Sequence, residues 1–474
     1  MPFDAPSPDL IDRFRAIVGD AHALTDPNDQ QPYLVEWRDK YLGRTPVVLR
    51  PGSVGEVSAI LALANETHTA IVPQGGNTGL VGGQIPVESG EEVVVSLSRL
   101  NRVREVDPRG NTMTVEAGVT LAACQDAADE VDRLFPLSLG SQGTCQIGGN
   151  ISTNAGGTAV LAYGNTRELV MGLEVVLADG TVWNGLRGLR KDNTGYDLKD
   201  LFIGAEGTLG IVTAAVLKLL PKPRARETAF IGLASPHQAL DLLNRAQAAA
   251  GPALVSFELM PRVLIDFCLK HLPGARDPID TRHDWYVLAE MASGVDDGRI
   301  RSLMETVLAD AFEDEIVENA VLAENSRQAA DFWAMRHGMS EVQKHEGGSI
   351  KHDVSVRVAD VPDFLDRAIA ACEATIDGCR PVPFGHLGDG NIHFNISQPV
   401  GGDKAAFLAR WEELARIVHG IVTEMGGSIS AEHGIGRMKQ PLLPGVKSAV
   451  EMGLMRTIKQ AFDPNGILNP GRVL

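Results

Sequence analysis

The densest group of chemically active side chains lies in residues 381–393, with the sequence P-V-P-F-G-H-L-G-D-G-N-I-H. The alternating pattern that follows predicts a strand over residues 391–396, in which successive side chains point to opposite faces. One face is apolar, and the other carries Asn391, His393 and Asn395. The glycines before the strand allow a tight turn, so we expect His386 to come back toward His393.

Two histidines and a carboxylate are a common ligand set for a divalent metal ion, because neutral imidazole is the commonest metal ligand. The segment A-E-H-G-I-G, residues 431–436, supplies the carboxylate. We predict that His386, His393 and Glu432 bind the metal and that His433, beside a ligand, is left as a general base. Zinc is the first choice, followed by manganese or iron, because this ligand set does not settle the metal. The alternative is a pair of hydrogen-bonded histidines in a glycine-rich turn.

A second polar group, in residues 332–351, could hold a carboxylate. Arg336 and Ser340 stand at i and i+4 on one face of an expected helix, and Lys351 follows a glycine pair. In an acidic protein, such a basic residue beside aromatic side chains could bind a carboxylate through charge-assisted hydrogen bonds. The alternative is a surface arginine.

Composition limits the classes of protein that this chain could be. Its 474 residues suffice for two or three domains. A formal net charge of −18 argues against nucleic acid or an anionic membrane as the main partner. The five cysteines form no C-x-x-C pair, which favours a reducing compartment. No signal peptide or transmembrane run is recognised, so we expect a cytoplasmic protein without an integral membrane segment.

The first half of the chain has an α+β pattern. A capping-box pattern at Ser53 and Glu56 marks the start of one helix. The turn at residues 178–180 indicates a hairpin between residues 173–177 and 181–183. The expected helices cover residues 8–18, 53–68 and 121–131, and the other expected strands cover residues 46–50, 69–73, 93–97, 113–117 and 214–220.

Three glycine-rich blocks interrupt this half, at residues 73–83, 136–157 and 197–213. Glycines in the first block leave backbone N–H groups free to point at an anion. The second block lacks helical or strand periodicity, so we expect irregular backbone wrapped along an extended polar ligand. The chain has neither a P-loop nor a G-x-G-x-x-G motif, which excludes the P-loop nucleotide site and the nicotinamide-binding fingerprint.

Four motifs resemble the vanillyl-alcohol-oxidase type of FAD-binding fold. They are P-Q-G-G-N-T-G-L-V-G-G, G-S-Q-G-T-C-Q-I-G-G-N-I-S-T-N-A-G-G, F-I-G-A-E-G-T-L-G-I-V-T and F-D-P-N-G-I-L-N-P-G-R-V-L. With the His/His/Glu-His set, the chain from about residue 45 onward resembles the FAD-linked D-2-hydroxyacid dehydrogenases. That family includes the D-2-hydroxyglutarate and flavin-type D-lactate dehydrogenases and the FAD subunit of glycolate oxidase.

The resemblance implies an α+β protein with a two-part FAD-binding domain and an α+β cap, or substrate, domain. We expect residues 1–222 to form the first part of the FAD-binding domain and residues 426–474 to return to it. Residues 223–425 would form the cap, an antiparallel sheet with helices on one face. Its expected helices cover residues 235–250, 298–312 and 361–377, and its strands include residues 255–260 and 285–291. A site at the domain interface follows.

The resemblance also implies how FAD is held. The first block lacks the histidine that relatives with covalently bound flavin carry there, so we expect non-covalent FAD. Residues 74–79 would hold the pyrophosphate. The residues expected to bind FAD are Pro73, Gln74, Gly75, Gly76, Asn77, Thr78, Gly79, Leu80, Leu139, Gly140, Ser141, Thr144, Gly148, Gly149, Asn150, Thr153, Asn154, Glu206, Gly207, Gly210, Ile211, Val212 and Asn469.

The implied reaction is hydride transfer from C2 of a D-2-hydroxy acid to flavin N5, with D-2-hydroxyglutarate as the first choice of substrate. Arg336, Ser340 and Lys351 would hold the carboxylate, Asn395 would orient the substrate or a ligand, and His433 would take the hydroxyl proton. The metal would lower the pKa of that hydroxyl. An electron-transfer flavoprotein or a quinone is the expected acceptor, and a homodimer is the expected assembly.

Several other activities stay open on the sequence. The substrate could be D-lactate, D-malate or that of a glycolate-oxidase-type subunit. The protein could be an oxidase that passes electrons to oxygen, or a non-redox flavin transferase of the same fold. A hydrolase that uses the metal site alone is the remaining alternative.

Overall fold

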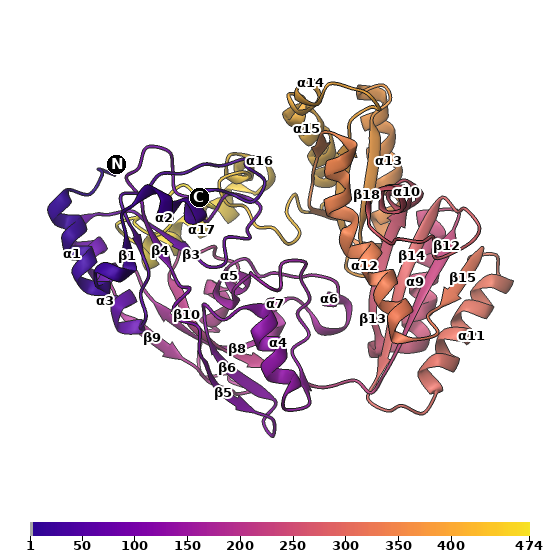
Figure 1. Cartoon of the computed structure of the whole chain (residues 1–474), viewed down its shortest axis with the longest axis horizontal. Coiled ribbons are helices and arrows are strands. Elements are labelled where there is room, and N and C mark those ends of the chain that lie inside the picture. Colours follow the sequence, from indigo (N-terminus) through magenta and orange to yellow (C-terminus); the bar gives the residue numbers. More distant parts are fainter. Residues whose placement is uncertain (1–2) are drawn as a thin grey trace. The chain divides into compact units, whose positions relative to one another are not determined.

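The computed structural model describes residues 3–474, and the chain divides into two compact units. Unit 1 contains the chain up to Gly156, Gly164–Lys222 and His433–Leu474. Unit 2 contains Gly157–Tyr163 and Pro223–Glu432. The return to unit 1 falls at His433, whereas the sequence analysis placed it at residue 426. Of the second glycine-rich block, only the last residue, Gly157, belongs to unit 2. Figure 1 shows the yellow C-terminal segment among the elements of unit 1.

Unit 1 is built around two main sheets. The first has the order β1 (Ala23–Leu24), β2 (Val48–Leu49), β4 (Val93–Ser96), β3 (Ile71–Gln74), with β2, β4 and β3 parallel. The second is antiparallel, with the order β5 (Val103–Asp107), β6 (Thr112–Glu116), β10 (Ile211–Lys218), β8 (Val170–Val176), β9 (Val182–Gly185). The hairpin expected from the turn at residues 178–180 joins β8 to β9. A separate pair joins β7 (Arg133–Leu134) to β11 (Leu220–Pro221).

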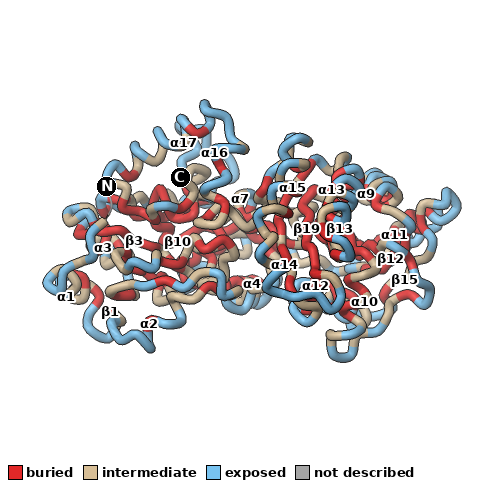
Figure 2. The backbone as a smooth tube through the Cα atoms, turned by 90° about the horizontal axis from the view of Figure 1, so that it is seen from above, coloured by how far each residue is buried: buried red, intermediate tan, exposed pale blue. Residues whose placement is uncertain are grey.

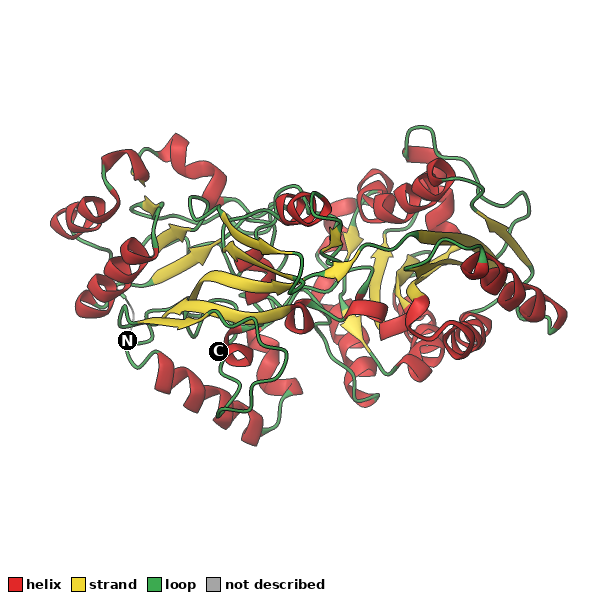
Figure 3. Cartoon of the chain, turned by 90° about the horizontal axis from the view of Figure 1, so that it is seen from below, coloured by secondary structure: helices red, strands yellow, loops and turns green. Residues whose placement is uncertain are grey.

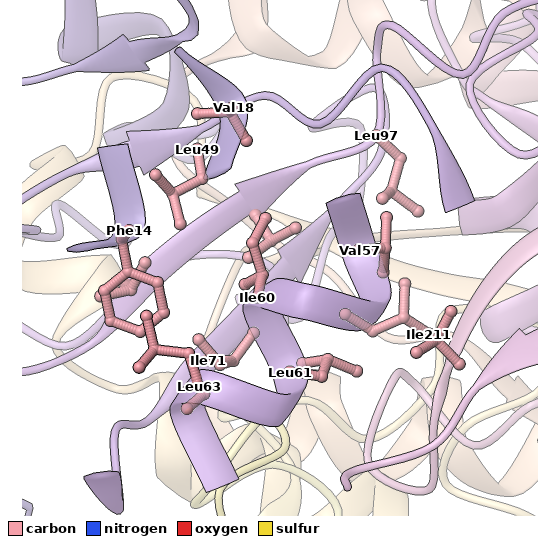
Figure 4. Close-up of a cluster of buried hydrophobic side chains, with 14 of the residues drawn as sticks. Phe14, Val18, Leu49, Val57, Ile60, Leu61, Leu63, Ile71, Leu97 and Ile211 are labelled. Atoms are coloured by element: carbon pink, nitrogen blue, oxygen red, sulfur yellow. The ribbon is translucent and has the colours of Figure 1, made fainter. Parts of the chain in front are cut away.

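The core of unit 1 lies between its first sheet and its longer helices. Figure 4 shows Phe14 and Val18 of α1 (Pro8–Val18) beside Ile60 of α3 (Val54–Thr67), together with Leu49 of β2 and Ile211 of β10. All of them are buried, so side chains of both sheets enter one apolar cluster. The other helices of unit 1 are α2 (Pro27–Leu34), α4 (Leu121–Asp129), α5 (Ile147–Ser152), α7 (Thr166–Leu169), α8 (Lys199–Phe202), α16 (Leu443–Val446) and α17 (Ala449–Phe462).

Helix α3 begins where the sequence predicted it. The Ser53 hydroxyl accepts the backbone N–H of Glu56 at 3.2 Å, and the Glu56 carboxylate accepts the N–H of Gly52 at 2.8 Å. The carboxylate thus reaches one residue farther back than in a standard capping box.

The second glycine-rich block contains a helix that the sequence did not predict. Residues Ile147–Ser152 form α5, so the expectation of an irregular segment was wrong there. The helix has only six residues, two of them glycine, which is too short for a 3.6-residue pattern to emerge. Burial of Ile147 and Ile151, at i and i+4, stabilises it instead.

The C-terminal segment completes the first sheet of unit 1. The N–H of Ile71 donates to the carbonyl of Ile467 at 2.8 Å, and the N–H of Asn469 donates to the carbonyl of Ile71 at 2.8 Å. Arg472 is buried and pairs with Glu92, with 2.9 Å between Nη2 and Oε2. The end of the chain therefore lies along β3, beside the first glycine-rich block.

Unit 2 contains an eight-stranded antiparallel sheet, which confirms the expected cap architecture. The strand order is β15 (Asn319–Leu322), β12 (Ala225–Leu233), β14 (Trp285–Ser293), β13 (Leu254–Pro261), β18 (Arg380–His386), β19 (Asn391–Ser397), β16 (Ser349–Ile350), and β17 (Val354–Ser355) also pairs with β19. In each unit the strands lie inside and the helices outside (Figure 3).

Helices cover both faces of this sheet, so the expectation of helices on one face was wrong. Helices α10 (Arg262–His271) and α12 (Ser326–Val342) pack on one face, and α9 (Pro236–Ala250), α11 (Arg299–Glu313) and α13 (Val361–Thr375) lie on the other (Figure 2). The neighbours Tyr286 and Val287 of β14 point to opposite faces and are both 0% exposed, because each face is covered. The remaining helices of unit 2 are α6 (Val160–Tyr163), α14 (Lys404–Leu408) and α15 (Trp411–Glu424).

Within residues 3–474, no helix is both long enough and apolar enough to cross a bilayer.

Candidate active site

The turn between β18 and β19 brings the two histidines of the first motif together. His386 ends β18 opposite Asn391, and His393 on β19 pairs with Phe384. Gly390 takes φ of +80° in this turn, a conformation that glycine adopts without strain. The imidazole rings of His386 and His393 have centroids 5.4 Å apart and lie nearly perpendicular.

Two carboxylates of unit 2 lie beside His393. Nε2 of His393 is 3.6 Å from Oε1 of Glu432, and Nδ1 is 3.9 Å from Oδ1 of Asp353. The other Glu432 oxygen accepts the N–H of Gly157 at 3.0 Å. Glu432 therefore stands next to β19 although it comes from a later segment of the chain.

Asp353 is a site residue that the sequence analysis missed. Its Oδ2 accepts the backbone N–H groups of Ala431 at 3.1 Å and Glu432 at 3.0 Å, and its Oδ1 accepts the amide of Asn391 at 3.0 Å. It lies between two short strands and belongs to no recognisable motif. The only sequence signal is an aspartate soon after Lys351. Its importance becomes visible in the structure, where the side chain is only 2% exposed.

The donor atoms in unit 2 fit a divalent cation. Asp353, His393 and Glu432 each offer one ligand atom within 4.8 Å of the others. Oxygen and imidazole donors of this kind suit zinc, manganese or iron. His433, the next residue after Glu432, belongs to unit 1.

His386 is oriented as a metal ligand often is. Its Nδ1 lies 2.8 Å from Oε1 of Glu258, a carboxylate on β13. Metal-ligating histidines commonly bind a carboxylate through one ring nitrogen, which leaves the other nitrogen for the metal. Nε2 of His386 is thus the nitrogen that could join the ligand set.

Arg336 on α12 is buried at 5% exposure, so the alternative of a surface arginine was wrong. Its Nε donates to Oε2 of Glu258 at 2.9 Å, and the guanidinium lies 4.9 Å from the ring centroid of Phe384. Nη2 is 2.7 Å from the same Glu258 oxygen and forms an ion pair with it. Glu258 thus occupies Nε and Nη2, and the remaining nitrogen, Nη1, can donate a charge-assisted hydrogen bond to an anionic ligand.

Glu258 therefore stands between the imidazole of His386 and the guanidinium of Arg336. Burial would raise the pKa of the Glu258 carboxyl, but the charges of His386 and Arg336 outweigh burial and lower it to about 2. Burial opposes protonation of His386, yet the carboxylate of Glu258 raises its pKa to about 9. In the nearby turn, burial raises the pKa of Asp389 to about 6.

The other expected substrate-binding residues lie around the C-terminal end of α12 and on β19. Nζ of Lys351 donates to the carbonyl of Ser340 at 3.0 Å, and Ser340 is exposed one turn after Arg336. Asn395 is 2% exposed and its amide donates to Oε1 of Gln343 at 3.1 Å. The polar face predicted for the strand thus exists, with part of its capacity used by neighbouring side chains.

In unit 1, the three glycine-rich blocks pack against one another. A Cβ on Gly76 would lie 2.0 Å from the carbonyl oxygen of Thr144, which joins the first block to the second. A Cβ on Gly207, where φ is +72°, would lie 2.5 Å from Cγ of Pro73, which joins the third block to the first. Only glycine fits at these two close approaches.

Several of the expected FAD-binding residues keep polar atoms or open space for a ligand. Gln74 donates its amide to the carbonyls of Tyr33 and Gln84, both at 2.9 Å, but its Oε1 is buried without a hydrogen bond. Oδ1 of Asn469 is also buried without a hydrogen bond. A Cβ on Gly140 or Gly149 would meet no atom within 4 Å. These features fit an extended polar cofactor such as FAD.

Other expected FAD-binding residues use their side chains within the fold. Glu206 accepts the N–H groups of Ile435 at 2.6 Å and Gly436 at 2.7 Å, and burial raises the pKa of its carboxyl. Ile211 and Val212 are buried in β10. A further group of these residues contacts other residues of unit 1: Asn77, Gly79, Leu80, Gly148, Asn150, Thr153, Asn154 and Gly210. Gly75, Thr78, Leu139 and Ser141 lie in loops.

Comparison with known proteins identifies the family. Residues 45–185 match an FAD binding domain, and residues 222–473 match the C-terminal domain of FAD linked oxidases. The chain belongs to this family and is an FAD-dependent oxidoreductase. The expected vanillyl-alcohol-oxidase-type fold is confirmed by the crystal structure of p-cresol methylhydroxylase with substrate bound. The TM-score is 0.77 at 17% identity, over 98% of this chain and 96% of that one.

Relatives that are similar over nearly the whole chain include proteins named D-2-hydroxyglutarate dehydrogenase. A probable mitochondrial D-2-hydroxyglutarate dehydrogenase of Oryza sativa subsp. indica is 40% identical over 98% of this chain and 82% of its own length. A D-2-hydroxyglutarate dehydrogenase of Xanthomonas citri pv. viticola is 38% identical over 95% of this chain and 93% of its own length. The resemblance to the FAD-linked D-2-hydroxyacid dehydrogenases, which the motifs indicated, is confirmed.

Proposed function

We propose that this protein oxidises D-2-hydroxyglutarate to its 2-oxo acid. The relatives named above, similar over nearly the whole chain, support this substrate. The structural observation that supports it most directly is the buried guanidinium of Arg336, which Glu258 contacts through Nε and Nη2 only. A protein with a net charge of −18 needs such a local cation to bind a dianionic substrate.

The carboxylate of the substrate would be held from α12. Arg336 donates charge-assisted hydrogen bonds from Nη1, the nitrogen that Glu258 leaves available. Lys351, held at the carbonyl of Ser340, adds a second cation, and the Ser340 hydroxyl adds a neutral donor. Asn395 orients the substrate or a ligand from β19.

We assign the metal ligands to His386, His393 and Glu432. Asp353 offers an oxygen to the same group, but both of its oxygens already accept N–H groups, so it serves to position Glu432. A divalent cation held there would lower the pKa of the substrate hydroxyl. Zinc, manganese and iron all suit these donors.

His433 is the proposed general base, because it follows the ligand Glu432 directly in the chain. Its imidazole takes the hydroxyl proton of the substrate, a role that typically accelerates a reaction by about 10²–10⁴. FAD supplies the chemistry of hydride acceptance from C2. The glycine-rich blocks of unit 1 are the proposed FAD-binding segments, and the absence of histidine from residues 73–83 supports non-covalent binding.

The cellular setting is also part of the proposal. All five cysteines are buried and unpaired, which supports a reducing compartment such as the cytoplasm. An electron-transfer flavoprotein or a quinone would reoxidise the flavin. The homodimer stays a prediction, and light scattering of the purified protein tests it.

An anaerobic flavin spectrum tests the reaction and the substrate together. We expect D-2-hydroxyglutarate to bleach the flavin and its L-enantiomer to leave it oxidised. Faster bleaching by D-lactate or D-malate would reassign the substrate. A flavin that no D-2-hydroxy acid reduces would contradict the proposed dehydrogenase.

A chelator tests the metal separately. Removing the metal should stop flavin reduction and leave the flavin absorbance in place. Full activity after removal would contradict a metal that acts on the substrate.

A further inference from the structure

Glu258 on β13 connects the two halves of the proposed site. Its side chain is 1% exposed, and its two oxygens point to different partners. Oε1 is 2.8 Å from Nδ1 of His386 on β18, and Oε2 is 2.9 Å from Nε of Arg336 on α12. One carboxylate therefore joins the expected metal-ligating histidine to the expected carboxylate-binding arginine.

We propose that Glu258 is a positioning residue that couples metal binding by His386 to substrate binding by Arg336. This inference rests on the proposed function, because it takes the roles of those two residues from there. Glu258 itself touches neither the metal nor the substrate. It acts by fixing which nitrogen atoms of its partners remain for them.

On the metal side, Glu258 selects the ring nitrogen of His386. Nδ1 is committed to the carboxylate, so only Nε2 can coordinate a cation. A partner of this kind fixes the orientation of the ring and raises the basicity of the ligand, and losing it typically costs about 10–100-fold in metal affinity.

On the substrate side, Glu258 selects the nitrogens of Arg336. Nε is committed to the carboxylate, and the ring of Phe384 supports the guanidinium at 4.9 Å. The Glu258 carboxylate also pairs with Nη2, so it occupies one edge of the guanidinium and leaves Nη1 as the donor for an anion. The carboxylate also fixes α12 against β13, because a buried charge must keep its partners.

The strand register makes this arrangement possible. Glu258 lies directly opposite His386 where β13 pairs with β18, and β18 pairs with β19, which carries His393. The two oxygens of one carboxylate have a fixed separation, so a shift of His386 or Arg336 should move the carboxylate and thereby displace the other partner. Metal affinity and substrate affinity should therefore fall together when this carboxylate is lost.

A second buried glutamate on the same sheet provides the matched control. Glu290 on β14 is 8% exposed, forms an ion pair with Arg226 and accepts Nε1–H of Trp333 at 3.0 Å. It resembles Glu258 in burial and in having a cationic partner, but its partners have no role in the proposed site. Removing its charge tests the general cost of a lost buried carboxylate.

The experiment compares Glu258→Gln and Glu290→Gln in the full-length, FAD-loaded protein after metal removal. Two quantities are measured: the Kd for Zn²⁺, by competition with a chromogenic chelator, and the steady-state constants for D-2-hydroxyglutarate at saturating Zn²⁺. We expect Glu258→Gln to weaken Zn²⁺ binding about 10–100-fold and to raise KM more than it lowers kcat. Glu290→Gln should leave both quantities close to those of the wild type.

Two results would overturn the proposal. One is wild-type Zn²⁺ affinity and KM in Glu258→Gln, and the other is an equal loss in both variants, which would indicate a general effect on the sheet. If Glu258→Gln does not fold, Glu258→Asp replaces it, because the shorter carboxylate should reach only one partner. Unchanged Zn²⁺ affinity and KM in Glu258→Asp would also overturn the coupling.

The Zn²⁺ measurement separates this proposal from the proposed function. If the wild-type protein binds Zn²⁺ but no D-2-hydroxy acid reduces its flavin, the proposed reaction is refuted. The Zn²⁺ affinity of Glu258→Gln then still tests whether Glu258 positions His386 for metal binding. A wild-type protein that binds no divalent cation refutes the metal assignment and the coupling together.

Discussion

Oδ2 of Asp353 accepts the backbone N–H of Glu432 at 3.0 Å. A buried aspartate next to β17 thereby fixes the last residue of unit 2 beside β19, where His393 lies 3.6 Å from Glu432. Neither Glu432 nor His393 could be placed relative to the other from local sequence. A single side chain that no motif marks therefore controls the geometry of the expected ligand set.

Asp353→Asn should weaken metal binding about ten-fold and leave FAD bound, since metal sites depend on the groups that orient their ligands. An amide has one acceptor oxygen and no charge, so it cannot serve all three N–H donors that Asp353 now accepts. Bound zinc, manganese and iron, measured by elemental analysis, and the flavin absorbance test this expectation. Asp366→Asn, an exposed change on α13, is the control. Full metal content in Asp353→Asn would show that Asp353 does not position the ligands.

Arg336→Met should raise the KM for the hydroxy acid and lower kcat/KM about 10–100-fold, because a hydrogen bond to a charged group contributes about 1.5–3 kcal/mol. The change also leaves Glu258 without one of its two partners, which should lower the melting temperature. Kinetics must therefore be measured well below that temperature. Arg327→Met, an 86% exposed position on the same helix, should change neither quantity. Unaltered kinetics in Arg336→Met would remove Arg336 from the substrate site.

The comparison of β19 with β13 shows what the sequence could predict. The alternation in residues 391–396 predicted both the strand and its polar face, because period 2 is a local property. Glu258 occurs in an ordinary strand segment and gained its role only through pairing with His386, a residue 128 positions away. Local patterns carry no information on such long-range register, so no sequence motif marks this carboxylate.

Helix α5 and the covering of both faces of the sheet in unit 2 could not be predicted from local sequence either. Ile147 and Ile151 stabilise a helix whose sequence is rich in glycine, so tertiary burial overrides local propensity there. The strand β14 is buried on both faces, which the sequence pattern of residues 285–291 did not reveal. Which faces are covered depends on helices that pack from elsewhere in the chain.

Glu346→Gln should reduce the free energy of unfolding at neutral pH, with a difference from the wild type that shrinks in acid. Burial opposes ionisation of Glu346, but hydrogen bonds from Arg380, Lys270 and His271 lower the pKa of its carboxyl to about 2. A carboxyl with a lowered folded-state pKa stabilises the protein above its unfolded value of 4.5, and this contribution is lost as the pH falls toward 2. Urea unfolding at pH 7, 5 and 4 measures the trend. Glu341→Gln, an exposed change, is the control, and a difference independent of pH would contradict the assignment.

His433→Ala should slow anaerobic flavin reduction about 10²–10⁴-fold, the usual contribution of a general base. FAD binding should persist, because the glycine-rich blocks that we assign to it lie elsewhere in the sequence. Metal content should persist as well, since the proposed ligands are His386, His393 and Glu432. Stopped-flow absorbance with D-2-hydroxyglutarate measures the rate, and raised pH should partly restore it, because hydroxide can then take the proton. His345→Ala, an exposed histidine outside the site, should be reduced at the wild-type rate. Near wild-type reduction in His433→Ala would move the base to another residue, and Glu432 and its neighbours would then require the same test.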